Sequence, residues 1–144
     1  MMGKEMTKDN IITLAWHSPL SFDPQLYGIC VGKTRFTHDL IKESNVFAVN
    51  FVPHDMKDLA LYCGRTTGAS TDKFAKDGLT KEDCDTIHCS RIAEASAVLE
   101  CEVVDSFETG DHTFFVGKVV KTLDRDDKKR LLYMGEERFT STLS

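Results

Sequence analysis

The sequence predicts a mainly β protein with peripheral helices. The clearest signal is a hairpin in which the segments Ala97 to Phe107 and His112 to Thr122 alternate with the two-residue period of strands around Thr109-Gly110-Asp111. A short apolar run from Val46 to Val52 predicts a central strand. Helix signals occur only in short stretches, so we expect the helices to cover a sheet rather than to form the core.

The N-terminal part predicts a further strand and then a loop. Side chains alternate from Ile11 to Trp16, which is the pattern of a strand. The prolines of Ser18-Pro19 and Asp23-Pro24 then predict that the chain leaves the sheet and re-enters it. Exposed backbone groups and the hydroxyls of Ser18 and Ser21 suit the edge of a flat heterocycle, although an ordinary polar loop has the same composition.

A helix is predicted from about Thr37 to Ser44. We expect Thr37 to be its N-cap, with Phe36 and Ile41 forming a hydrophobic staple around it. Free amides at a helix start favour anions, and basic or hydroxyl side chains cluster there: Lys33, Thr34, Arg35 and His38. The pattern favours a phosphate site, and the alternative is a capped helix with solvated basic neighbours.

The middle of the chain predicts two more helices. Asp55 is expected to cap a helix that ends at Gly64 in a left-handed conformation. Ser70 or Thr71 is expected to cap a short helix that ends at Gly78. The side chains of Arg65, Thr66, Thr67, Ser70 and Lys73 suit phosphate or ribose oxygens, and equally suit a solvated loop. The segment 80–95 has no clear period, so its structure stays open.

His112 is expected at the rim of the returning strand of the hairpin. A histidine there is suited either to a hydrogen bond with a ligand carbonyl or to capping the turn. After the hairpin, the tail from Asp124 to Ser144 carries apolar residues suited to docking on the domain or on a partner subunit: Leu131, Leu132, Tyr133 and Phe139.

Length and composition exclude several classes of protein. The 144 residues, 41% of them hydrophobic and 28% charged, predict one globular domain over residues 1–144. A net charge of −5 argues against a nucleic-acid surface, and no apolar run is long enough to span a bilayer. We therefore expect a cytoplasmic protein that binds neither nucleic acid nor membrane.

The cysteine spacing and the absence of known motifs exclude further classes of protein. Five cysteines without framework spacing favour reduced thiols, with Cys101 in the core. Cys84, His88 and Cys89 lack a Cys-x-x-Cys pair and a clear fourth ligand, so no metal site is expected. The motifs of Rossmann domains, P-loop nucleotidases, serine hydrolases and zincins are all absent. The anion-binding helix start, the polar loop beside aromatic residues and the rim histidine suit a bound cofactor.

Ordered motifs from Asn10 to about Phe139 resemble the flavin reductase-like, FMN-binding split-barrel family, which includes the flavoredoxins. They are Asn10-x-x-Thr13-x-x-Trp16-x-Ser18-Pro19-x-Ser21-Phe22-Asp23-Pro24, Gly32-Lys33-x-Arg35-x-Thr37-His38, Phe47-Ala48-Val49-Asn50, Tyr62-Cys63-Gly64, Asp72-Lys73-Phe74, Leu99-Glu100-Cys101 and Gly110-Asp111-His112-Thr113. The resemblance implies a split β-barrel. Because only Met1 to Asp9 precede Asn10, we expect the first strand of the family to be missing.

The resemblance also implies a homodimer with flavin near its interface. The flavin would be FMN, with FAD as an alternative, and NAD(P)H would be the co-substrate. The implied catalytic residue is His112, which would lie near the reacting face of the flavin. The implied cofactor-binding residues are Asn10, Thr13, Trp16, Ser18, Pro19, Ser21, Lys33, Arg35, Thr37, His38, Ser70 and Lys73.

Three functional hypotheses follow from these observations, and the third is a dimeric scaffold that binds no flavin and stays colourless with added FMN. The first is an oxidoreductase that transfers hydride from NAD(P)H to bound flavin and passes electrons to an acceptor, for which a redox partner protein is one candidate. The second is a flavin-binding electron carrier or flavin store without a nicotinamide site. The rate of reduction by NADH and NADPH would discriminate between them.

Overall fold

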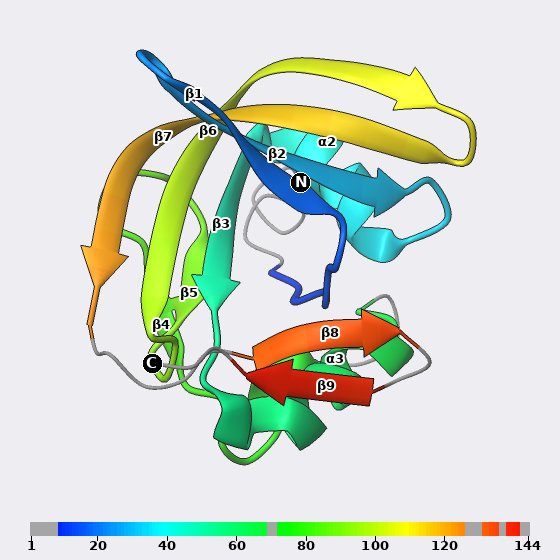
Figure 1. Ribbon diagram of the computed structural model, residues 1–144, viewed down its shortest axis with the longest axis vertical. Helices are drawn as coiled ribbons and strands as arrows, with labels where there is room; N and C mark the ends of the chain where they lie inside the picture. Colours follow the sequence, from blue (N-terminus) through cyan, green and yellow to red (C-terminus); the bar gives the residue numbers. More distant parts are fainter. Residues whose placement is uncertain (1–8, 69–71, 126–130, 136–137, 142–144) are drawn as a thin grey trace, which may run out of the picture.

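A curved antiparallel sheet forms the body of the protein in the computed structural model (Figure 1). The structure describes residues 9–68 and 72–125 in full, and residues 131–135 and 138–141 by their backbone. The sheet has the strand order β1-β2-β7-β6-β3. Its strands are β1 (His17–Phe22), β2 (Gln25–Gly32), β3 (Val46–Phe51), β6 (Ala97–Thr109) and β7 (His112–Asp124).

The helices lie outside this sheet, as the sequence predicts. They are α2 (Phe36–Ser44), α3 (Lys57–Arg65) and the 3₁₀ turns η1 (His54–Met56) and η2 (Lys73–Ala75). Two small hairpins complete the described chain: β4 (Lys81–Asp83) with β5 (Ser90–Ile92), and β8 (Leu131–Gly135) with β9 (Arg138–Ser141). Strand β8 lies beside η1. No described helix is long and apolar enough to cross a bilayer.

The predicted β6–β7 hairpin is confirmed, and its two strands lie in the interior of the sheet between β2 and β3. Its register pairs Thr109 with His112 at the turn and Ala97 with Asp124 at the far end. Gly110 takes a φ of 62° in the turn, which glycine adopts without steric cost. Inward side chains from these strands and from β2 make the main core, in which Val31 and Cys101 are fully buried. The predicted core position of Cys101 is confirmed.

The prediction of a strand at Ile11 to Trp16 is wrong. This segment is extended but joins no strand ladder; instead β1 begins at His17, and Ser18, Pro19 and Ser21 lie in that strand rather than in a loop. The alternation has another cause, because Ile12 and Leu14 pack on the main core whereas Ile11 packs on a second one. A two-residue period predicts an extended backbone but not its partner.

Pro19 is compatible with β1 because β1 is an edge strand. The chain reverses tightly at Asp23-Pro24, where Phe22 pairs with Gln25. The strand predicted at Val46 to Val52 is present as β3. Its predicted central position is wrong, since β3 lies at the edge of the sheet opposite β1. The β4–β5 hairpin covers it, with the Ile92 amide donating to Asn50 Oδ1 at 2.9 Å.

Helix α2 begins one residue before the predicted start. Its N-cap is Arg35, without a side-chain cap, so Thr37 is not the cap and no staple is centred on it. Thr37 is instead a buried residue of the first turn. The helix ends at Ser44 as predicted, and Asn45 takes the left-handed conformation with a φ of 59°.

The end of the next helix also differs from the prediction. Gly64 lies inside α3 and not at a left-handed end, and its Cα faces Thr13 closely: a Cβ there would lie 3.2 Å from Thr13 Cβ. The helix thus needs glycine for close approach rather than for termination. The residue that caps η2 is Asp72, whose carboxylate accepts from the Phe74 amide. Ser70 and Thr71, the predicted caps, lie outside the described residues. Residues 1–8 lie outside them too, so the expected absence of the first family strand stays a prediction.

Candidate functional site

A pocket of about 200 Å³ lies between the start of α2, the end of α3 and the N-terminal segment. It is lined by Asn10, Ile12, Thr34, Arg35, Phe36, Thr37, Gly64, Arg65, Thr66, Thr67, Gly68 and Lys73. Three of these residues are cationic and four carry hydroxyls, so the lining is suited to an anion bearing further polar groups. The sequence expectation of an anion site at this helix start is compatible with this lining and stays a prediction.

Asn10 carries a polar atom in this pocket that the protein does not satisfy. Its Nδ2 donates to Thr37 Oγ1 at 2.7 Å, which fixes the direction of the amide. Its Oδ1 is buried and has no hydrogen-bond partner among the described residues. A buried unpaired acceptor costs about 1–3 kcal/mol. A ligand hydroxyl or N–H in the pocket would remove that cost, which makes Asn10 a fitting contact for a polyhydroxylated ligand.

Gly68 is placed so that the Asn10 amide can reach the pocket. A Cβ on Gly68 would lie 2.2 Å from Asn10 Oδ1, which no real structure tolerates. Sequence reasoning missed Gly68, along with the pocket-lining side chains of Ile12 and Phe36. The only signal in the sequence was the Thr66-Thr67-Gly68 turn, which is common in loops that bind nothing.

Arg35 and Lys73 both line the pocket but differ in what holds them. Arg35 Nη2 donates to the Gly64 carbonyl at 2.9 Å, which fixes the guanidinium against the end of α3. Lys73 is 2% exposed, and its Nζ donates to the carbonyls of Ile11 and Cys63. Burial lowers the pKa of Lys73, the nearby Cys63 raises it, and the charge of Arg35 lowers it further. Lys73 therefore ties the N-terminal segment to α3, and Arg35 is the better placed cation for a ligand.

An aromatic pair adjoins the pocket. The rings of Trp16 and His112 lie 4.5 Å apart, and Trp16 is 62% exposed. A Cβ on Gly32 would lie 3.4 Å from Arg35 Cγ and 3.8 Å from His112 Nε2, so the side chains of Arg35 and His112 both lie next to Gly32. His112 Nδ1 also contacts Asp111 Oδ1 at 2.7 Å, and this contact lowers the pKa of Asp111. Both predicted roles of His112, at the turn and near a ligand, are compatible with this position.

Four other predicted site residues are not part of the pocket lining. Thr13 Oγ1 donates to the Ala60 carbonyl and serves helix packing. Lys33 forms an ion pair with Glu108 at 3.7 Å. His38 is 6% exposed and contacts Thr113 Oγ1 at 2.7 Å beneath the sheet. The fourth is Ser18, whose hydroxyl donates to the Pro19 carbonyl on the exposed edge strand. Each of these side chains already has a protein partner.

The structure therefore divides the predicted cofactor-binding set. The pocket brings together Asn10, Arg35, Thr37 and Lys73. Trp16 and His112 flank it, whereas Pro19 and Ser21 lie in β1 and outside the pocket lining. Ser70 lies outside the described residues.

Comparison with known proteins places the chain in a family. The model of the flavin reductase like domain matches residues 4–142. An uncharacterized protein of Archaeoglobus fulgidus is 40% identical over 119 residues, which cover 83% of this chain and 67% of that protein. The chain spans about half to two thirds of the length of the curated archaeal relatives that it matches.

Solved structures agree with this assignment. An FMN-binding protein from Thermus thermophilus superposes with a TM-score of 0.84 at 29% identity, covering 92% of this chain and 78% of that one. The NADH:FAD oxidoreductase of Streptomyces globisporus C-1027 gives a TM-score of 0.80 at 28% identity, covering 90% and 75%. The chain therefore belongs to the flavin reductase-like family, and its mainly β fold is the split β-barrel of the FMN-binding proteins in that family.

Proposed function

We propose that this protein is an FMN-binding oxidoreductase that takes hydride from NAD(P)H and passes the electrons to an acceptor. The observation that carries the proposal is the pocket, in which the Arg35 guanidinium and the unpaired Asn10 Oδ1 face the same space as several hydroxyls. Bound flavin would supply the redox chemistry, because its ring accepts hydride and releases electrons in steps that side chains do not provide. FAD remains the alternative cofactor.

The protein's own residues would bind and orient the cofactor. Arg35 is held by the Gly64 carbonyl, so its guanidinium is pre-organised for a phosphate group. Asn10 Oδ1 would accept a hydrogen bond from a ligand hydroxyl. The exposed face of Trp16 beside His112 offers an apolar surface for a flat ring. No side chain needs to transfer a proton for hydride to move, so His112 is assigned a positioning role near the ring.

We further propose that the protein acts as a cytoplasmic homodimer. Large apolar side chains stand exposed on the described surface: Trp16 (62%), Leu20 (45%), Phe22 (101%), Val104 (55%) and Phe107 (53%). Exposed apolar surface of this kind marks protein contacts in soluble proteins. Free cysteines are typical of reducing compartments, which supports the location. Light scattering on the purified protein should give twice the mass of the chain, and a monomer would reject the dimer.

The test is a titration of FMN with the purified protein, followed by quenching of flavin fluorescence, with riboflavin in parallel. Saturable binding with a clear preference for FMN is expected, because only FMN carries the phosphate that Arg35 would hold. Equal affinity for the two ligands, or no binding, would contradict the pocket assignment. NADH and NADPH oxidation by the loaded protein then tests the reaction, and slow reduction by both would favour an electron carrier or flavin store.

A further inference from the structure

Two cysteines face each other where the β4–β5 hairpin closes. In this hairpin Asp83 pairs with Ser90, and the next residues along both strands are Cys84 and Cys89. The Cys84 amide donates to the Cys89 carbonyl at 2.9 Å, so the cross-strand pairing continues through the two cysteines. The Cys89 thiol donates to the Ser90 carbonyl at 3.4 Å, and the pKa values of the two thiols are shifted by their mutual interaction. Both residues are partly exposed, whereas Cys63 and Cys101 are buried.

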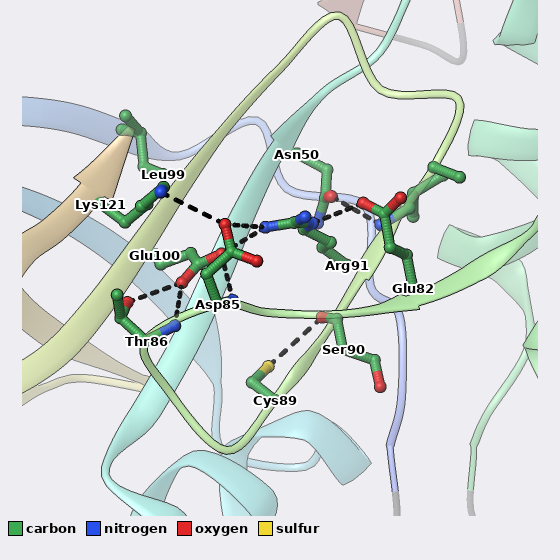
Figure 2. Close-up of polar contacts among 12 residues, drawn as sticks. Asn50, Glu82, Asp85, Thr86, Cys89, Ser90, Arg91, Leu99, Glu100 and Lys121 are labelled. Carbon is green, nitrogen blue, oxygen red and sulfur yellow. Dashed lines mark hydrogen bonds and ion pairs between the residues drawn. The ribbon is translucent and has the colours of Figure 1, made fainter. Parts of the chain in front are cut away.

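The loop between these cysteines is fastened to the sheet. Glu100, on β6, accepts hydrogen bonds from the Asp85 amide at 3.0 Å, the Thr86 amide at 2.9 Å and the Thr86 hydroxyl at 2.6 Å (Figure 2). Arg91 binds the same carboxylate at 2.6 Å and reaches Asp85 at 3.4 Å. These contacts fix the start of the loop at Asp85 and Thr86 and hold Arg91 of β5 against β6.

We propose that Cys84 and Cys89 form a redox-active dithiol site that closes to an intramolecular disulfide when the protein meets a peroxide. Directly paired residues of antiparallel strands have Cα atoms about 4.5–5.5 Å apart, and disulfides need about 4.4–6.8 Å. The hydrogen bond between the Cys84 amide and the Cys89 carbonyl brings the two residues close to this spacing, which favours the bond. The site is separate from the flavin pocket, and the proposal does not rest on the proposed function.

The reaction is balanced by the peroxide alone. One thiolate attacks a peroxide oxygen, the O–O bond breaks, and the departing oxygen leaves as water while the sulfur becomes a sulfenic acid. The second thiol then attacks that sulfur, the S–O bond breaks, and a second water leaves. Hydrogen peroxide thus takes two electrons and two protons from the thiols, and a dithiol reductant reverses the change.

The environment indicates which sulfur reacts first. The hydrogen bond from Cys84 lowers the pKa of the Cys89 thiol against the opposing effect of burial. The same hydrogen bond, together with burial, raises the pKa of Cys84. Because the thiolate is the nucleophile, the lowered pKa favours Cys89 as the attacking residue and Cys84 as the resolving one.

The experiment treats the reduced full-length protein with one equivalent of hydrogen peroxide and then measures intact mass and disulfide-linked peptides. The expected result is the loss of two hydrogen atoms and a peptide that joins Cys84 to Cys89 within one chain. Cys84→Ser and Cys89→Ser should each abolish this bond, and Cys84→Ser should leave a sulfenic acid on Cys89 that dimedone traps. Cys30→Ser is the matched control on a partly exposed cysteine and should behave as the wild type.

A second measurement needs no substitution. Phenylarsine oxide bridges thiols that lie close together, so the reduced protein should bind one equivalent and the oxidised protein none. Retention of all five thiols after peroxide, a disulfide to any other cysteine or between two chains, or no binding of the arsenical would each overturn the proposal. Circular dichroism of the reduced variants verifies that each has folded.

Discussion

Glu100 and Asn10 both place polar side-chain atoms in the interior of the molecule, and they differ in how completely the protein satisfies them. Glu100 is fully buried, and its two carboxylate oxygens accept from two amides, one hydroxyl and the Arg91 guanidinium. Asn10 Oδ1 has no partner among the described residues and borders a pocket. A complete network holds the fold together, whereas an incomplete one beside a cavity is suited to a ligand.

Breaking the complete network should have the largest effect. Glu100→Gln removes the negative charge that balances the buried Arg91 and replaces two acceptor oxygens with one. Loss of one partner of a buried ion pair costs about 3–5 kcal/mol, so we expect a loss of that size in the free energy of unfolding. Chemical denaturation measures it. Glu102→Gln, at an exposed position of the same strand, is the control and should change stability by less than about 0.5 kcal/mol.

The same carboxylate predicts how stability depends on pH. Burial would raise the pKa of Glu100, but the hydrogen bonds from Thr86, Asp85 and Arg91 outweigh it and lower the pKa from 4.5 to about 2. A lowered folded-state pKa adds stability above the unfolded-state value, and that stability is lost as pH falls from about 4.5 towards 2. Denaturation series over this range should show a steeper loss in the wild type than in Glu100→Gln. Parallel curves would contradict the assignment.

The pocket should respond through binding more than through stability. Arg35→Ala removes a charged donor, which is worth about 1.5–3 kcal/mol, so FMN affinity should fall by roughly 10- to 150-fold. Riboflavin lacks the phosphate and should lose much less. Parallel fluorescence titrations measure both ligands. Lys42→Ala, at an exposed position in the last turn of the same helix, is the charge-matched control, and a similar loss of FMN affinity there would indicate a nonspecific charge effect.

Asn10→Ala should give the smallest effect and reveals what the unpaired oxygen contributes. The substitution removes the Asn10–Thr37 hydrogen bond, worth about 0.5–1.5 kcal/mol, and also removes a buried acceptor that the free protein leaves unsatisfied. The stability of the free protein should therefore change little, while flavin affinity falls by about 1 kcal/mol. Thermal melts with and without FMN separate the effect on the stability of the free protein from the effect on flavin affinity. A large loss of stability without ligand would mean that Asn10 serves the fold alone.

Some of this architecture was predictable because its signals are local. The β6–β7 hairpin follows from alternation and a glycine turn, and α2 follows from a capped amphipathic stretch, although its N-cap is Arg35 rather than Thr37. Alternation at Ile11 to Trp16 was misassigned because extended backbone beside helices gives the same period as a strand. The hairpin at β4–β5 was left open because its strands are short and Arg91 and Glu100 meet only in three dimensions.

The candidate site, like the fold, was predictable only in part. Arg35, Thr37 and Asn10 belong to short motifs, so resemblance alone brought them together. Lys73 lines the pocket as expected but has an interior role, which depends on the carbonyls of Ile11 and Cys63 and is invisible in sequence. Distant contacts decide whether a polar residue is already satisfied, and no local pattern records them.

Pro19 limits how this sheet associates with other chains. The Cys30 amide donates to the Trp16 carbonyl, and alternation from that bond makes Pro19 and Tyr27 a non-hydrogen-bonded pair. The nitrogen of Pro19 therefore points to the free side of β1, where it has no hydrogen to offer an incoming strand. Exposed sheet edges are templates for fibrillar aggregation, and proline is one of the residues that block them. Any assembly at this edge must use side chains rather than a continued backbone ladder.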